Sequence, residues 1–178
     1  MIRLAADLKQ PFILYGGHGA FAAADLLKQA NVPMLVSVKW PERNRDADPE
    51  DVDSFRALEM RDKAPGAPAA LAKAGVKFAL YSDGTAAPRD VIRSVRKAID
   101  AGLPADAAVR AMTLSPAEIY GVSDRMGSLE KGKIANLLVT KGDLFADKTE
   151  VKYVFVDGAK FEPAEPPAAA ASQSGEGR

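Results

Sequence analysis

Two side chains in this sequence, Asp83 and His18, could bind a metal ion or move a proton. Asp83 follows the apolar run 76–81 and precedes Gly84, while His18 lies within the segment 16–19, Gly-Gly-His-Gly. In parallel α/β folds, ligand-binding and catalytic groups lie at the carboxyl ends of strands, and both residues follow a predicted strand. Each also has a structural interpretation: Asp83 as a turn residue or helix N-cap, and His18 as a loop residue before a helix.

These two groups alone are too few for a zinc site, which usually takes three or four protein ligands. His18 is the only histidine, and the chain has no cysteine, which excludes thiolate ligands and disulfide bonds. The glycines of 16–19 would also suit a phosphate group at the start of a helix. That segment, however, matches neither the Walker motif nor the full dinucleotide fingerprint.

A long polar loop, residues 40–53, is predicted after the second strand. It combines Trp40 and Arg43 with several carboxylates and has little apolar content. Long loops in compact domains are often functional, so an exposed Trp40 beside Arg43 would be a candidate substrate contact. The alternative is a loop whose charges are simply solvated, which is the commoner role of charge-rich loops.

These residues are positioned by parallel βα units, which are followed by antiparallel strands. The predicted strands, which are short apolar runs, are 12–15, 32–38, 76–81, 134–140 and 151–156. The predicted helices, marked by good helix formers with proline, glycine or asparagine near their ends, are 20–30, 52–61, 68–74, 88–102, 104–112 and 116–120. Asp157 and Gly158 predict a hairpin turn. The Pro-, Ala-, Ser- and Gly-rich segment 163–178 predicts a disordered tail.

Composition limits the classes of function. The 178 residues fit one ordinary domain or one and a half small ones, and 47% of them are hydrophobic, enough for a core. Lys plus Arg and Asp plus Glu both number 24, so the balanced charge carries no signature of nucleic-acid or anionic-membrane binding. No apolar run approaches the roughly 20 residues that span a bilayer. The composition is compatible with a cytoplasmic and with a periplasmic location of the protein.

Three segments together resemble the carboxyl-terminal third of the metal-dependent amidohydrolase superfamily. Residues 103–121 read LPADAAVRAMTLSPAEIYG, and residues 125–139 read RMGSLEKGKIANLLV. Residues 154–158, VFVDG, resemble the closing hairpin of the family. The family usually has Ala-Asp before the strand, where this chain has Ala135-Asn136. The nearest resemblance is to the imidazolonepropionase-like group, which includes prolidase-like members.

The resemblance implies an α/β fold: a (β/α)8 TIM-type barrel beside a small β-sandwich, with one or two divalent metals, usually zinc, at the barrel mouth. The metals activate a water that attacks a C–N bond of an amide, a cyclic amide or a dipeptide. The family aspartate that ends the eighth strand binds metal and carries the proton, and Asp83 matches it. The family's sixth-strand histidine aligns best with Gly16, and His18 lies two residues away. The other histidine ligands have no counterpart.

We therefore expect residues 1–122 to form about the last three strands of the barrel, 123–162 to form sandwich strands, and 163–178 to be the tail. A closed barrel needs about 200 residues or more, so the chain is expected to be a fragment that is inactive and retains no metal alone. Its expected partners are the missing barrel half or another copy, since open sheet edges invite pairing. The alternative is a non-catalytic binding or scaffold module derived from a decayed amidohydrolase.

Overall fold

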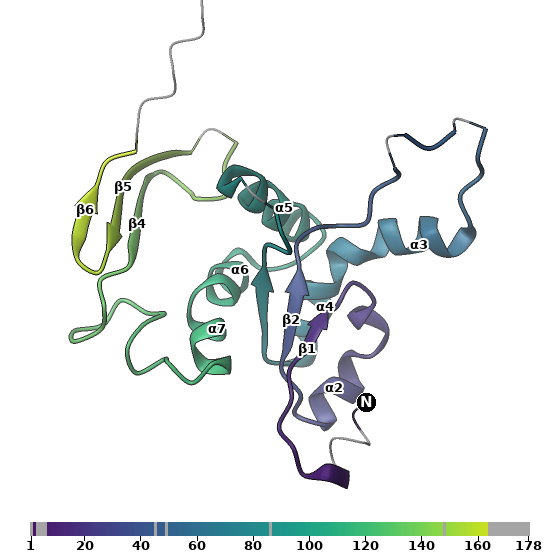
Figure 1. Ribbon diagram of the computed structural model, residues 1–178, viewed down its shortest axis with the longest axis horizontal. Coiled ribbons are helices and arrows are strands. Elements are labelled where there is room, and N and C mark those ends of the chain that lie inside the picture. Colours follow the sequence, from purple (N-terminus) through teal and green to yellow (C-terminus); the bar gives the residue numbers. More distant parts are fainter. Residues whose placement is uncertain are drawn as a thin grey trace, which may run out of the picture. The chain divides into compact units, whose positions relative to one another are not determined.

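The computed structural model describes residues 2, 7–44, 46–48, 50–85, 87–147 and 149–163. The chain divides into two compact units, Met1–Lys133 and Ile134–Arg178, and Figure 1 shows the elements of each. Most of the predicted tail, residues 164–178, lies outside the described residues. Within the described ranges, no helix combines the length and the apolar character that crossing a bilayer requires.

The first unit is built on a three-stranded parallel sheet, as the sequence predicts. Its strands are β1 (Leu14–Gly16), β2 (Met34–Ser37) and β3 (Phe78–Tyr81), in the order β1-β2-β3. Leu14 pairs with Met34, which pairs with Phe78, and the three arrows in Figure 1 point the same way. All four residues of the central strand β2 are buried, which accounts for its continuous apolar sequence.

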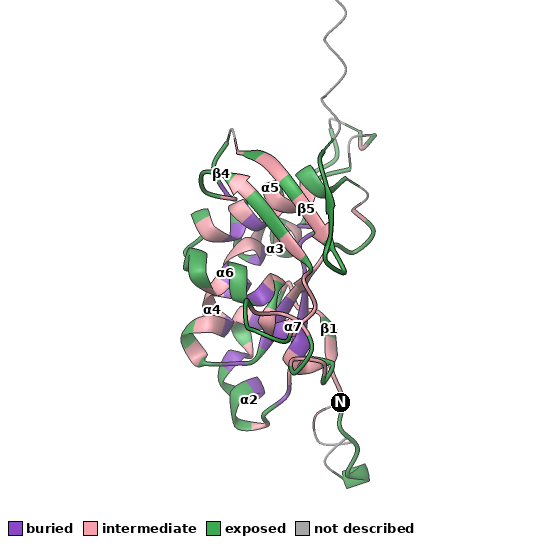
Figure 2. Ribbon diagram, turned by 90° about the vertical axis from the view of Figure 1, so that its left-hand side faces the viewer, coloured by how far each residue is buried: buried purple, intermediate pink, exposed green. Residues whose placement is uncertain are grey.

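Helices lie beside this sheet and supply most of the remaining core. The elements are the 3-10 turns η1 (Ala20–Ala22) and η2 (Ala64–Gly66) and the helices α2 (Ala24–Gln29), α3 (Phe55–Lys63), α4 (Ala67–Ala74), α5 (Pro88–Asp100), α6 (Ala105–Met112) and α7 (Leu114–Ile119). Their buried side chains include Leu71 of α4 and Val95 of α5. Figure 2 shows helices with buried residues on one side and exposed residues on another, the pattern of amphipathic helices on a sheet.

The first two predicted helices differ from the observed ones for local reasons. The predicted helix 20–30 is split into η1 and α2, because Ala23 leaves helical geometry at φ −130°. The predicted helix 52–61 begins later, because Ser54 is the N-cap and its hydroxyl accepts a hydrogen bond from the Ala57 N–H. Helix α5 begins with Pro88 at its first position, as predicted.

The second unit is an antiparallel sheet of β4 (Leu137–Lys141), β5 (Glu150–Val156) and β6 (Ala159–Phe161). The predicted hairpin turn is confirmed: Asp157 and Gly158 join β5 to β6 with φ of 50° and 84°, as a turn of type I′ requires. Strand β4 begins three residues later than predicted, and Asn136, the residue before it, binds the hairpin turn instead. Its side-chain oxygen accepts a hydrogen bond of 2.8 Å from the Asp157 N–H. The sandwich that would contain this sheet stays a prediction.

Candidate functional site

The candidate site is the carboxyl edge of the parallel sheet, where three chain segments leave neighbouring strands. His18 follows β1, Ser37 ends β2 and Asp83 follows β3. Because parallel strands share one carboxyl edge, side chains that are distant in sequence meet there. The structure thus brings Asp83 and His18 to the same edge through a common neighbour, Ser37.

Asp83 occupies a backbone conformation that few residue types accept. Its φ is 49° and that of Gly84 is 78°, and the turn is closed by a 3.0 Å hydrogen bond from the Thr85 N–H to the Ser82 carbonyl. Aspartate tolerates the left-handed region better than most residues, and glycine tolerates it without cost. The Asp-Gly pair therefore makes the tight turn that carries the carboxylate directly after β3.

Ser37 binds the Asp83 carboxylate. Its hydroxyl donates a 2.8 Å hydrogen bond to Asp83 Oδ2 and accepts one of 3.1 Å from the Lys39 N–H. Only 1% of the Ser37 surface is exposed. Sequence reasoning passed over this residue, although a lone serine at the carboxyl end of an otherwise apolar strand was a usable signal.

His18 contacts the same residue through the main chain. Its Nε2 lies 3.2 Å from the Ser37 carbonyl oxygen. A carbonyl can only accept, so Nε2 carries the proton in the neutral ring, and the lone pair is on Nδ1. Nδ1 is then the atom of His18 that could bind a metal or accept a proton.

Three tyrosines lie near this edge and were also missed by sequence reasoning. The Tyr81 ring meets the Tyr15 ring edge to face, with centroids 5.8 Å apart, and the hydroxyls of Tyr15 and Tyr120 are 2.7 Å apart. Burial, followed by the nearby negative charge of Asp83, raises the pKa of Tyr81, while the neighbouring Ser37 hydroxyl acts in the opposite direction. Tyr81 therefore stays a neutral hydroxyl at ordinary pH.

The predicted exposure of Trp40 is wrong. Trp40 is only 6% exposed, because its indole packs beside the His18 ring at 5.7 Å and donates a 2.9 Å hydrogen bond to the Ser94 carbonyl in α5. It anchors the start of the loop after β2. Its role beside a substrate stays an untested prediction.

Arg43 organises the polar loop that follows. Its guanidinium donates hydrogen bonds of 2.9 and 2.8 Å to the carbonyls of Asp48 and Asp51. It also lies 3.9 Å from the Asp53 carboxylate, which pairs with Arg61 at 2.5 Å. These contacts hold the loop together from within, and a substrate contact by Arg43 stays a prediction.

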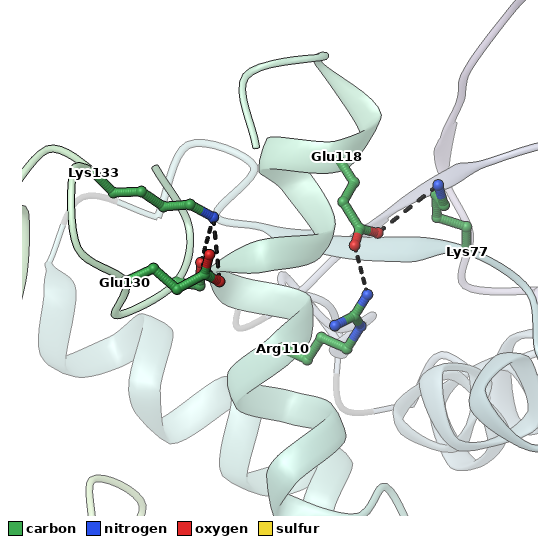
Figure 3. A network of polar contacts seen from close by, with 6 residues as sticks. Lys77, Arg110, Glu118, Glu130 and Lys133 are labelled. Atoms are coloured by element: carbon green, nitrogen blue, oxygen red, sulfur yellow. Dashed lines mark hydrogen bonds and ion pairs between the residues drawn. The ribbon is translucent and has the colours of Figure 1, made fainter. Parts of the chain in front are cut away.

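The segments that carry the family resemblance are held by charged side chains (Figure 3). Glu118 of α7 pairs with Arg110 of α6 at 2.7 Å and with Lys77 at 3.8 Å. Lys133 donates to the Ser128 hydroxyl and pairs with Glu130 at 3.4 Å. These contacts fix the turns of the motif.

Asp83 and His18 are of the ligand types that zinc accepts, a carboxylate oxygen and an imidazole nitrogen. Within the residues that the structure describes, however, no group of three or more His, Cys, Asp or Glu side chains is arranged to hold a metal. These donors fit part of a metal site and do not complete one.

Comparison with known proteins gives a consistent result. The model of the amidohydrolase family matches residues 7–160. Adenine deaminase of Methanothermobacter thermautotrophicus is 30% identical over 167 residues, which are 88% of this chain and 28% of the deaminase. N-acetylglucosamine-6-phosphate deacetylase of Haemophilus influenzae is 44% identical over 50 residues, which are 28% of this chain and 13% of the deacetylase.

Solved structures agree in fold. An amidohydrolase from Thermotoga maritima superposes with a TM-score of 0.75 at 28% identity, over 91% of this chain and 40% of that one. A Xaa-Pro dipeptidase superposes with a TM-score of 0.66 at 20% identity, over 91% of this chain and 47% of that one. This chain therefore spans less than half the length of each of these proteins.

Proposed function

This chain belongs to the amidohydrolase family, and on that premise we propose that it is the carboxyl-terminal part of a metal-dependent hydrolase of C–N bonds. The bonds are those of amides, cyclic amides or dipeptides in small molecules. The adenine deaminase and the N-acetylglucosamine-6-phosphate deacetylase that it resembles are both named for the cleavage of a C–N bond.

The observation that carries the proposal is the position of Asp83. Its carboxylate follows β3 at the carboxyl edge of a parallel sheet, and Ser37 on the neighbouring strand binds one of its oxygens. Catalytic groups of parallel barrels lie at this edge. This hydrogen bond holds the carboxylate at the edge where we propose that it acts.

Asp83 and, as a second candidate, His18 through Nδ1 would hold a divalent metal, zinc in the first instance. When bound, such a metal lowers the pKa of water and polarises the scissile carbonyl. Asp83 accepts a proton from the attacking water and returns it to the nitrogen that leaves, which is general base and then general acid catalysis. Tyr81, two residues before it on β3, supplies a neutral hydroxyl near the same edge.

The remaining ligands come from strands other than β1, β2 and β3, carried by the same polypeptide or by another one. We therefore propose that the 178-residue chain neither retains zinc nor turns over substrate by itself. Its partner in this scheme is the rest of the barrel, which would pair with the sheet edges.

An assay of the isolated chain with zinc and with amide and dipeptide substrates tests the inactivity. Zinc-dependent turnover that Asp83→Ala abolishes would overturn it. The coding sequence upstream of Met1 tests the wider proposal: a continuous frame encoding His-x-His supports a metal-dependent enzyme. If the chain joined to such a segment neither binds zinc nor hydrolyses any C–N bond, the proposal fails and the non-catalytic binding module replaces it.

A further inference from the structure

Ser37 differs from every other polar residue near the site in the completeness of its burial and bonding. It is one of two buried polar side chains among the described residues, the other being Ser115. Burying a hydroxyl is unfavourable unless it is hydrogen-bonded, and the Ser37 hydroxyl is bonded on both sides, by Lys39 and Asp83.

The direction of these bonds is fixed by chemistry. The Lys39 N–H can only donate, so the Ser37 oxygen accepts from it. The single hydroxyl proton of Ser37 is therefore donated to Asp83 Oδ2, because a carboxylate oxygen without a proton can only accept. The contact thus orients the Asp83 carboxylate.

The contact also distinguishes the two oxygens of the carboxylate. Oδ2 is occupied by Ser37 at 2.8 Å, whereas Oδ1 has no hydrogen-bond donor within the part of the chain that the structure describes. We infer that Ser37 is a positioning residue. It holds the Asp83 side chain in one rotamer and leaves Oδ1 as the oxygen available for the proposed role of Asp83, which is to bind metal and accept a proton. This inference rests on the proposed role of Asp83 for its functional meaning, but its geometry can be tested without metal or substrate.

The experiment is NMR spectroscopy of the full chain, in which the three-bond couplings between Hα and the two Hβ protons of Asp83 report its χ1 rotamer. The wild-type chain should give unequal couplings that fit one staggered rotamer. Ser37→Ala removes the donor, and both couplings should collapse towards a common averaged value. Ser37→Cys, which keeps a similar size but is a weak donor, should do the same and decides the matter if Ser37→Ala does not fold.

Ser115→Ala is the matched control, because it deletes the other buried serine hydroxyl, in α7, and should leave the Asp83 couplings unchanged. Averaged couplings in the wild-type chain overturn the inference. So do unchanged couplings in the Ser37 variants, or an equal collapse in Ser115→Ala. If the couplings behave as expected while the completed enzyme shows no metal-dependent hydrolysis, the positioning role stands and the proposed function falls.

Discussion

The indole nitrogen of Trp40 is bonded to the main-chain carbonyl of Ser94, across 2.9 Å. Trp40 begins the loop after β2, and Ser94 lies in the middle of α5, which follows the Asp83 turn. Since the Trp40 ring also packs beside His18, one buried side chain joins the segments that leave all three strands. The rigidity of this edge therefore depends on packing by Trp40.

Trp40→Ala should reduce the free energy of unfolding by about 3–5 kcal/mol, the usual loss for a buried aromatic. Trp40→Phe keeps a ring but loses the indole N–H that donates to the Ser94 carbonyl, and should lose about 0.5–1.5 kcal/mol. Urea unfolding followed by circular dichroism measures both. Wild-type stability in Trp40→Ala would contradict the packing role.

Asp83→Ala and Asp83→Asn should differ in stability although both remove the charge. Alanine at the observed φ of 49° costs about 1–2 kcal/mol of backbone strain, whereas asparagine tolerates this region and can still accept the Ser37 hydroxyl. Thermal unfolding of the two variants gives the comparison. Equal melting temperatures would mean that the turn does not need a residue suited to positive φ.

Two glycines of the family motif should respond differently to alanine. A Cβ at Gly127 would lie 2.7 Å from Ala117 Cβ and 3.0 Å from the Thr113 carbonyl, whereas Gly132 has nothing within 4 Å. Both have positive φ, so each variant bears about 1–2 kcal/mol of strain. Gly127→Ala should lose about 1–3 kcal/mol more through overpacking, as denaturant unfolding can measure. Equal losses would show that the turn relaxes freely.

Asp53 should make stability depend on acidity. Its hydrogen bond with Arg61 is the main cause that lowers its pKa from the ordinary 3.8. A lowered pKa stabilises the folded chain above pH 3.8, and this contribution is lost as the pH falls from 3.8 through the lower folded value. The stability difference between the wild-type chain and Asp53→Asn should be constant near neutrality and shrink below pH 3.8. A difference that persists unchanged in acid would contradict the ion pair.

The isolated chain should self-associate through the outer edge of β1, which no strand of the described residues covers. The Leu14 N–H donates to the carbonyl of Pro33, the residue before β2, so by alternation the main-chain groups of Tyr15 face the open edge. The Tyr15 side chain is 59% exposed. Tyr15→Lys should weaken association, because lysine on an edge strand opposes pairing. Light scattering after size exclusion measures the mass.

Tyr120→Lys is the matched control for that experiment. Tyr120 is 55% exposed and shares the Tyr15 hydrogen bond, but it lies at the end of α7 and off the sheet. Its substitution should leave the association unchanged. A wild-type chain that is a clean monomer would count against an open edge.

The sequence by itself determined the elements and the family. Apolar runs predicted β1, β2 and β3 as parallel strands, Pro88 marked the start of α5, and Asp157-Gly158 marked the hairpin, because these signals are local and depend on backbone preference. The set of motifs at 103–121, 125–139 and 154–158 predicted the family that residues 7–160 match. Asp83 was found because it follows an apolar strand.

Only the tertiary structure decided which side chains surround Asp83 and which are buried. Ser37 is 46 residues from Asp83 along the chain, and Trp40 is 54 residues from Ser94. Neither contact leaves a local signal strong enough to identify its partner. Parallel strands bring distant segments to one edge. Packing against α5 then buries Trp40, although its charged neighbours in the sequence suggest a solvent-exposed loop. Burial and partnership depend on the whole arrangement of strands and helices, whereas turns and strands depend on the few residues that form them.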